Sequence, residues 1–144
     1  MADNAIILAG EYRKYQSKVI ASAQTIKPGM LVKLTSADEL TVHATRGGYA
    51  ERIVVLEDAL QGGIKTDTYT AGTVCDCAIM IPGSESQVIL KAGENVVIGD
   101  QLVSAGTGKF EKLSSTYIPL CVATEALDLS DSAAVDTLIN VRWL

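Results

Sequence analysis

The side chains that could carry out chemistry are few, and the first is the sole histidine, His43. An imidazole can act as general base for a serine when a carboxylate orients it, and such partners converge in space rather than in sequence. The chain contains no Gly-X-Ser-X-Gly segment, the turn that presents a nucleophilic serine in α/β-hydrolases. His43 falls on the polar side of an alternating segment, 40–45. We therefore expect a solvent-facing strand residue and no catalysis.

Cys75 and Cys77 offer two thiols which, on a strand, point to the same face. A structural zinc ion takes four ligands, and its cysteine pairs usually have two or more residues between them. Only Cys121 and His43, both distant in sequence, could complete such a set. We expect no metal site. The alternate positions of this strand would instead form an apolar face, in which free cysteine acts as a small hydrophobe: Cys75, Cys77, Ile79 and Ile81.

Other ligand-binding patterns are incomplete. The loop 128–132 has oxygen side chains but lacks the central glycine and late glutamate of an EF-hand. The glycine-rich segment 106–108 is too short for a dinucleotide fingerprint and lies between strands. The acidic pairs 38–39 and 57–58 lie at strand ends, and seven aromatic residues are too few for the sugar cleft of a glycosidase. The sequence predicts no enzyme, no catalytic residue and no cofactor.

The elements that position these residues are predicted to be strands. Valine, isoleucine and threonine make up 37 of the 144 residues, and Gly or Pro-Gly interrupts short apolar segments every 8 to 12 residues or so. A chain of this length buries a core without disulfides, and three cysteines, an odd number, do not form a disulfide framework. We predict an all-β fold, a single compact antiparallel β-barrel or sandwich domain over 26–144 with an N-terminal arm, 1–25. The predicted core contains Val32, Val42, Val54, Ile79, Ile89, Leu102, Val122 and Val141.

Strands are expected in nine segments. They are 30–34, 40–45, 52–56 (buried on both faces), 73–81 (the longest), 87–91, 101–104, 110–113, 118–124 and 137–143. The polar segment 57–69 is expected to be an exposed loop, and 106–108 to be the loop of a hairpin.

Charge and hydropathy exclude several partners. A net charge of −5 and a pI near 4.8 argue against nucleic acid, whose binding domains are usually basic. No apolar stretch reaches the roughly 20 residues of a membrane-spanning helix. The short apolar run 5–9 has no basic leader, so a signal peptide is not expected. We expect no nucleic-acid or membrane partner, and synthesis in a reducing compartment.

The N-terminal arm gathers residue types that are common in interfaces. Residues 1–33 carry five basic and two acidic side chains, whereas residues 73–144 carry four basic and nine acidic ones. Tyrosine and arginine are enriched at binding hot spots. We predict that the arm contacts an adjoining subunit or a partner protein; the alternative is that 6–20 dock onto their own barrel and protect a sheet edge. The predicted contact residues are Ile6, Ile7, Leu8, Tyr12, Arg13 and Tyr15.

Four segments carry a family resemblance. They are Pro28-Gly29-Met30-Leu31-Val32, the run 91–106 with Gly99-Asp100-Gln101-Leu102-Val103, the run 122–127 and the ending Ile139-Asn140-Val141-Arg142-Trp143-Leu144. Together they resemble the small head-decoration (cement) proteins of tailed bacteriophages, and the resemblance covers residues 26–144.

The resemblance implies a structural virion protein without an active site. Such a protein is made in the host cytoplasm, binds the outer surface of an assembled capsid as a homotrimer, and clamps neighbouring major capsid subunits against the internal pressure of DNA. The implied partners are the major capsid protein and sister copies, with no small-molecule substrate. Two alternatives stay open, a small ligand- or glycan-binding β module and a tail or fibre component of a virion.

Overall fold

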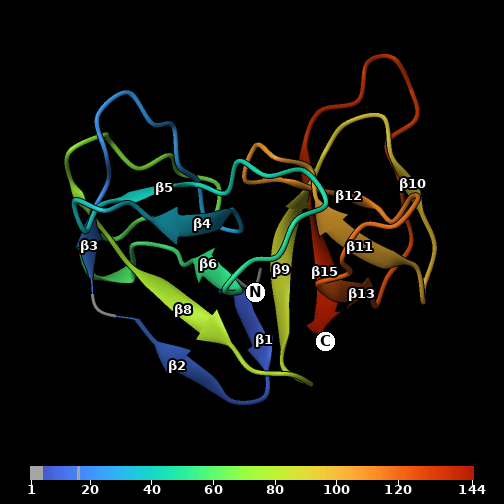
Figure 1. The fold of residues 1–144 in the computed structure, drawn as a ribbon, viewed down its shortest axis with the longest axis horizontal. Coiled ribbons are helices and arrows are strands. Elements are labelled where there is room, and N and C mark those ends of the chain that lie inside the picture. Colours follow the sequence, from blue (N-terminus) through green and yellow to red (C-terminus); the bar gives the residue numbers. More distant parts are fainter. Residues whose placement is uncertain (1–4, 16) are drawn as a thin grey trace.

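A closed barrel forms one half of the molecule in the computed structural model, which describes residues 5–15 and 17–144 (Figure 1). Its strands pair in the order β9 (Glu85–Leu90), β12 (Phe110–Lys112), β11 (Gln101–Ser104), β13 (Cys121–Ala123) and β15 (Thr137–Trp143). β15 pairs in turn with β9 and closes the ring. All pairs are antiparallel except β12 with β9. β1 (Ile7–Ala9) joins β9 from outside the ring.

Alternate side chains of β15 point into the barrel and help to fill it. Ile139, Val141 and Trp143 are buried at every second position of this strand. The Trp143 ring meets Phe110 edge to face, with ring centroids 5.9 Å apart. Its indole N–H donates to Ser86 Oγ at 2.8 Å, so the one polar atom of the ring is satisfied inside the core.

A second sheet packs against the barrel. Its antiparallel order is β2 (Tyr12–Lys14), β8 (Cys77–Met80), β6 (Ile53–Val55), β4 (Leu31–Leu34) and β5 (Leu40–Val42). Two small pairs complete the described strands: β3 (Lys18–Val19) with β7 (Val74–Cys75), and β10 (Asn95–Val96) with β14 (Leu127–Asp128). The described residues contain one 3₁₀ turn, η1 (Ala59–Gln61), and no α-helix. None of them forms a helix that could cross a membrane.

The second sheet is buried on both faces, which explains why β6 is continuously apolar. One face joins the core of the barrel through Leu31, Val54, Ala78 and Met80. The other face belongs to a second core and presents Val32, Ile53, Val55 and Cys77. This second face is covered by Ile20, Ile26 and Tyr69. The all-β prediction and the single compact domain are confirmed.

The predicted core and strands are confirmed in part, and the strands predicted over 40–45 and 118–124 are shorter, at 40–42 and 121–123. Val32, Val54, Ile89, Leu102 and Val141 are buried. The other three predicted core residues are partly buried: Val42, Ile79 and Val122. The long strand predicted over 73–81 is wrong, because it divides at Asp76, whose carbonyl accepts from Leu56 N at 2.9 Å. Ile81 lies beyond the end of β8 and is exposed, so it is not part of the apolar face on which Cys75 and Cys77 are buried.

Candidate interaction surface and its polar support

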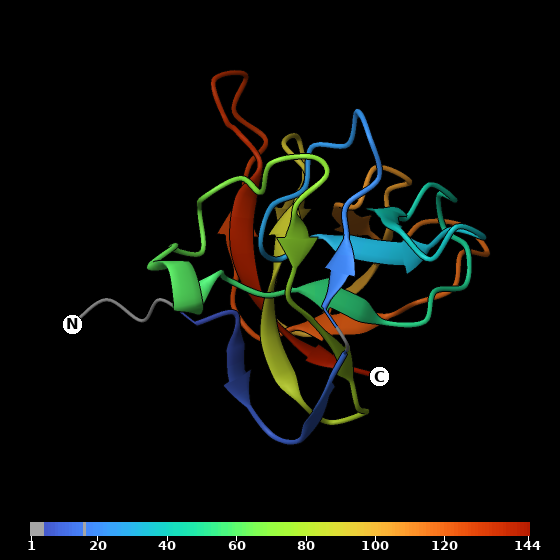
Figure 2. The ribbon, with the colours of Figure 1, turned by 90° about the vertical axis from the view of Figure 1, so that its left-hand side faces the viewer.

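The N-terminal segment docks onto its own domain. β1 pairs with β9, β2 with β8 and β3 with β7, and Figure 2 shows these blue strands against the yellow and green ones. Ile6 is fully buried in the barrel core, Ile7 and Leu8 are partly buried, and Tyr15 packs against the second core. These four predicted contact residues are thus wholly or partly buried by contacts within their own domain.

Tyr12 and Arg13, the remaining two predicted contact residues, are exposed on β2 together with Lys14. No described residue pairs with the charge of Arg13 or Lys14. Tyr15 N donates to Cys77 O at 2.9 Å, which makes Arg13 a hydrogen-bonded pair with Ile79 and points the N–H groups of its two neighbours away from the sheet. β2 is therefore an open, basic sheet edge.

The opposite edge of the same sheet is covered by the chain itself. Ala21 N donates to Leu40 O at 2.9 Å, and Gln24 Oε1 accepts from Val42 N at 3.2 Å. Lysine and arginine on an open edge oppose the pairing of two identical edges, because like charges would be brought together. The β2 edge is thus suited to a different, acidic partner rather than to itself.

His43 does not face solvent, and the prediction that it does is wrong. The chain leaves β5 after Val42, and the imidazole turns into the junction between the sheets, where it is buried. His43 Nε2 lies 2.8 Å from Tyr49 O, and Nδ1 lies 2.7 Å from Ser104 Oγ. Because a carbonyl only accepts, Nε2 carries the proton, and the hydroxyl of Ser104 donates to Nδ1. Ser104 is fully buried, so a substrate cannot reach this hydroxyl.

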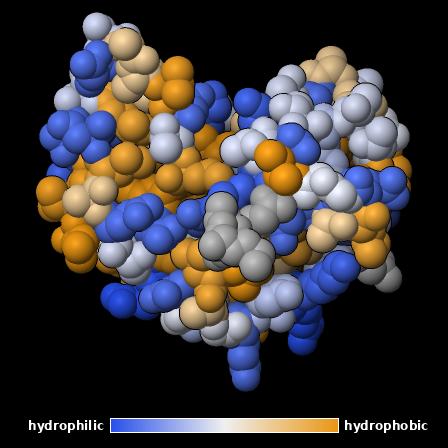
Figure 3. Space-filling model, turned by 180° about the vertical axis from the view of Figure 1, so that it is seen from behind, coloured by the Kyte–Doolittle hydropathy of each residue, from blue (hydrophilic) through white to orange (hydrophobic). Residues whose placement is uncertain are grey.

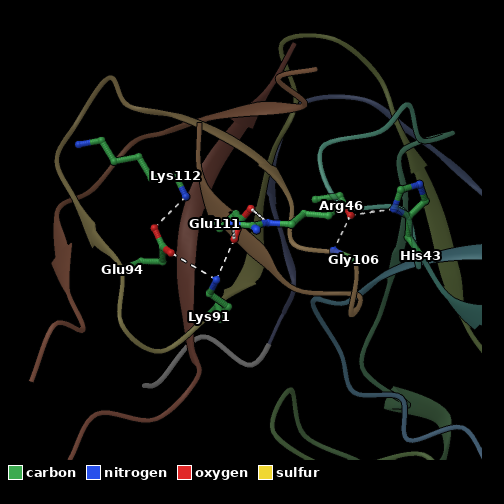
Figure 4. A network of polar contacts seen from close by, with 8 residues as sticks. His43, Arg46, Lys91, Glu94, Gly106, Glu111 and Lys112 are labelled. Atoms are coloured by element: carbon green, nitrogen blue, oxygen red, sulfur yellow. Dashed lines mark hydrogen bonds and ion pairs between the residues drawn. The ribbon is translucent and has the colours of Figure 1, made fainter. Parts of the chain in front are cut away.

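A buried carboxylate at the same junction organises four other charged residues (Figure 4). The Glu111 side chain is 2% exposed and accepts from Arg46 through Oε1 at 2.5 Å and Oε2 at 3.1 Å, and from Lys91 Nζ at 2.7 Å. Burial by itself would raise the pKa of Glu111, but these hydrogen bonds outweigh it and hold the pKa below the ordinary value. Glu94 extends the network to Lys91 and to the backbone N–H of Lys112.

The loop above this network is held in one conformation and displays an exposed aromatic ring. Gly47 has a φ of 65°, and a Cβ there would lie 2.2 Å from the Tyr117 ring, so only glycine fits. Its N–H donates to Ser104 O, and its carbonyl accepts from Ile118 N. The Arg46 guanidinium lies 5.7 Å from the Tyr117 ring centroid. Tyr49 on this loop is 68% exposed, and Ile118, whose N–H bonds to Gly47 of the same loop, is exposed as well; these two residues are the second exposed surface.

Sequence analysis did not identify this second surface. The available signal was Gly47-Gly48 followed directly by an aromatic residue, Tyr49. The residues that hold the loop, Ser104 and Glu111, come 55 or more positions later and carry no local pattern that relates them to it.

The remaining chemical candidates are structural. Cys75, Cys77 and Cys121 are free and buried, and burial raises the pKa of each thiol, that of Cys77 to about 12. Asp128 Oδ1 accepts from both the N–H and the hydroxyl of Ser130, which makes the loop a turn closed by its own side chain. The described residues contain no group of three or more His, Cys, Asp or Glu side chains arranged for a metal ion.

Comparison with known proteins finds a likeness of fold. The sequence matches no protein-family model and no curated protein. The structure is similar to the crystal structure of the head fiber gp8.5 N base of bacteriophage phi29, with a TM-score of 0.58. The match covers 93% of this chain and 95% of that chain, at 13% sequence identity. At this identity the comparison shows that the two chains share a fold over almost their whole lengths.

Proposed function

We propose that the protein is a structural component of a bacteriophage virion and attaches to the outer surface of the head. The observation that carries the proposal is the likeness of fold to a head fiber base, which extends over nearly all of both chains. The resemblance of residues 26–144 to head-decoration proteins, drawn from different features of the chain, points to the same location. The buried polar side chains His43, Ser104 and Glu111 are held in contacts between the two sheets, as expected for a binding protein.

The attachment surface in this proposal is the exposed part of the N-terminal segment. Tyr12 offers an exposed aromatic ring, and Arg13 and Lys14 offer unpaired positive charges beside an open row of backbone groups. The partner is the major capsid protein, contacted through acidic side chains. A homotrimer that bridges neighbouring capsid subunits would clamp them together, because each copy brings one such edge.

A sedimentation experiment tests the proposal. The purified protein is mixed with phage heads assembled from the major capsid protein of the source genome, and bound protein is measured in the pelleted heads. We expect saturable binding, and a loss of about tenfold or more in affinity for the double variant Tyr12→Ser/Arg13→Ser, since truncated hot-spot residues each cost at least 1–2 kcal/mol or so. Lys33→Ser removes an exposed charge from β4 and should bind as the unchanged protein does.

Two outcomes contradict different parts of the proposal. If the unchanged protein stays in the supernatant at every concentration, attachment to the head is wrong. If it pellets with the heads and the Tyr12→Ser/Arg13→Ser variant pellets equally, the attachment surface is wrong. A parallel variant, Tyr49→Ser, then tests the second exposed surface.

A further inference from the structure

A cavity of about 390 Å³ lies between the second sheet and the barrel. Figure 3 shows the molecular surface notched at the top between these two parts of the molecule. The floor of the cavity is apolar and is formed by Met30 and Ile89, which are buried, and by Val42, which is partly buried. A volume of this size suits a small ligand or a short end of a chain.

Backbone hydrogen bonds fix both walls of the cavity. On one side the turn Pro28-Gly29 is held to the barrel by the bond from Ile89 N to Gly29 O, 3.1 Å long. On the other side the hairpin loop 105–109 is held to the second sheet through Gly108, whose carbonyl accepts from Leu31 N at 2.8 Å and whose N–H donates to His43 O at 3.1 Å. The cavity is therefore formed before any ligand arrives.

Hydrogen-bond donors line the rim of the cavity. Lys27, on the turn, forms no close ion pair among the described residues, although its charge contributes to lowering the pKa of Asp136. Gln24 uses its Oε1 to accept from Val42 N, which leaves its amide N–H groups for another acceptor. Thr107, on the hairpin loop, also lines the cavity. Two segments, the connection between β3 and β4 and the hairpin loop, thus place residues with donor groups around one apolar floor.

The charge of the rim is positive in a chain that is acidic as a whole. Lys109 and Asp136 form an ion pair with Nζ–Oδ2 at 2.5 Å, and Asp136 Oδ1 also accepts from Ala92 N. This pair is electrically neutral, so Lys27 leaves the rim with one net positive charge. The whole chain carries −5. An anion is attracted to this rim, whereas a cation of similar shape is not.

We propose that this cavity binds a carboxylate carried on a short aliphatic chain, with the carboxylate at Lys27 and Gln24 and the aliphatic part on Met30 and Ile89. Two sources supply that chemistry, the C-terminal residue of a partner chain that ends in an aliphatic side chain, and a free aliphatic acid. The inference goes beyond attachment to a phage head and stands or falls separately from it.

Nuclear magnetic resonance titrations test the inference with two pairs of probes. The first pair is hexanoate and hexylamine, which differ in the sign of their charge. The second pair is acetyl-Gly-Leu with a free carboxylate and the same peptide as its C-terminal amide. We expect millimolar binding of both carboxylates, with shifts of the Met30 and Ile89 methyl signals and the Gly106 and Thr107 amides. Tighter binding of acetyl-Gly-Leu identifies the C-terminal residue of a partner chain as the source, and tighter binding of hexanoate identifies a free aliphatic acid.

Two matched lysine variants test whether the charge of Lys27 binds the carboxylate of the probe. Lys27→Met keeps the aliphatic stem and should weaken carboxylate binding about tenfold, in line with a hydrogen bond to a charged group. Lys33→Met removes an exposed lysine outside the cavity and should leave binding unchanged. Circular dichroism confirms that both variants fold. The inference is overturned if neither carboxylate shifts these signals, if hexylamine or the amide binds as well as its carboxylate partner, or if the two lysine variants bind alike.

Discussion

Arg46 and Glu111 lie 65 residues apart in the sequence, yet Arg46 Nε and Nη2 donate to Glu111 Oε1 and Oε2 at 2.5 and 3.1 Å. The pair joins the loop between β5 and β6 of the second sheet to β12 of the barrel. Glu111 is almost completely buried, whereas Arg46 reaches the surface and lies over Tyr117. The charge in the interior therefore fixes the position of a surface loop.

Acid should destabilise the protein through Glu111. Its pKa is lower in the folded protein than in the unfolded chain, where a glutamate titrates near 4.3 or so, and the folded state therefore binds fewer protons. The stability from this group is fully present above about pH 4.3 and is lost as the pH falls through the lower pKa of the folded state. Glu111→Gln should cost about 1–3 kcal/mol at neutral pH and should flatten the acid limb of the stability curve.

Urea denaturation at a series of pH values measures this effect. Glu94→Gln is the control, because the Glu94 carboxylate belongs to the same network but lies 3.6 Å from Lys91 Nζ and accepts from the backbone N–H of Lys112. Equal acid limbs for the unchanged protein and Glu111→Gln would show that this carboxylate does not control the acid response.

The hydrogen bond between His43 and Ser104 should show energetic coupling. Ser104→Ala leaves the imidazole Nδ1 without its donor and the Gly106 N–H without its acceptor, and His43→Phe removes the acceptor of the Ser104 hydroxyl and the donor to the Tyr49 carbonyl. Each single variant should cost about 1–3 kcal/mol, and a double-mutant cycle should give a coupling near 1 kcal/mol or so. Additive effects in thermal or urea unfolding would contradict the bond as described.

Variants in the N-terminal segment should lower the stability of the protein at buried positions and leave it unchanged at exposed ones. Ile6 is fully buried, so Ile6→Ala should destabilise the isolated protein by about 2–5 kcal/mol. Tyr12→Ser and Arg13→Ser change exposed side chains and should stay within about 0.5 kcal/mol of the unchanged protein. A melting temperature unaffected by Ile6→Ala would mean that the segment does not dock onto its own domain in solution.

The thiols should be unreactive in the folded state. All three cysteines are buried, and burial raises the pKa of each thiol, so the reactive thiolate is scarce near pH 8 or so. A disulfide reagent such as Ellman's should label none of them in the native protein and all three in guanidinium. Rapid labelling of one native thiol would identify a cysteine that the fold does not bury.

Local pattern predicts the strands but not their neighbours across the junction. The strand over 137–143 was predictable from alternation, and the strand over 101–104 from the turns that flank it, Gly99-Asp100 and 106–108. The alternation over 40–45 predicted a strand that ends at Val42 and the wrong environment for His43, since Ser104, which bonds its imidazole in the core, is 61 positions away. Tertiary contacts decide such positions.

The candidate surface was predictable in part for the same reason. The composition of the N-terminal segment indicates interface residue types, and Tyr12 and Arg13 are indeed exposed. Composition does not show that Tyr12 is exposed while Tyr15 packs against the second core. Which of the two is buried depends on the pairing of β2 with β8. The role of Tyr12 and Arg13 in binding stays a prediction.

Cryo-electron microscopy of the virion encoded by the source genome tests the central claim most directly. The account predicts density for a closed five-stranded barrel on the outer face of the head, with β2 turned toward the capsid shell. The account is contradicted if the protein is present in the particle and its density lies in the tail or inside the head, or if the purified virion does not contain the protein.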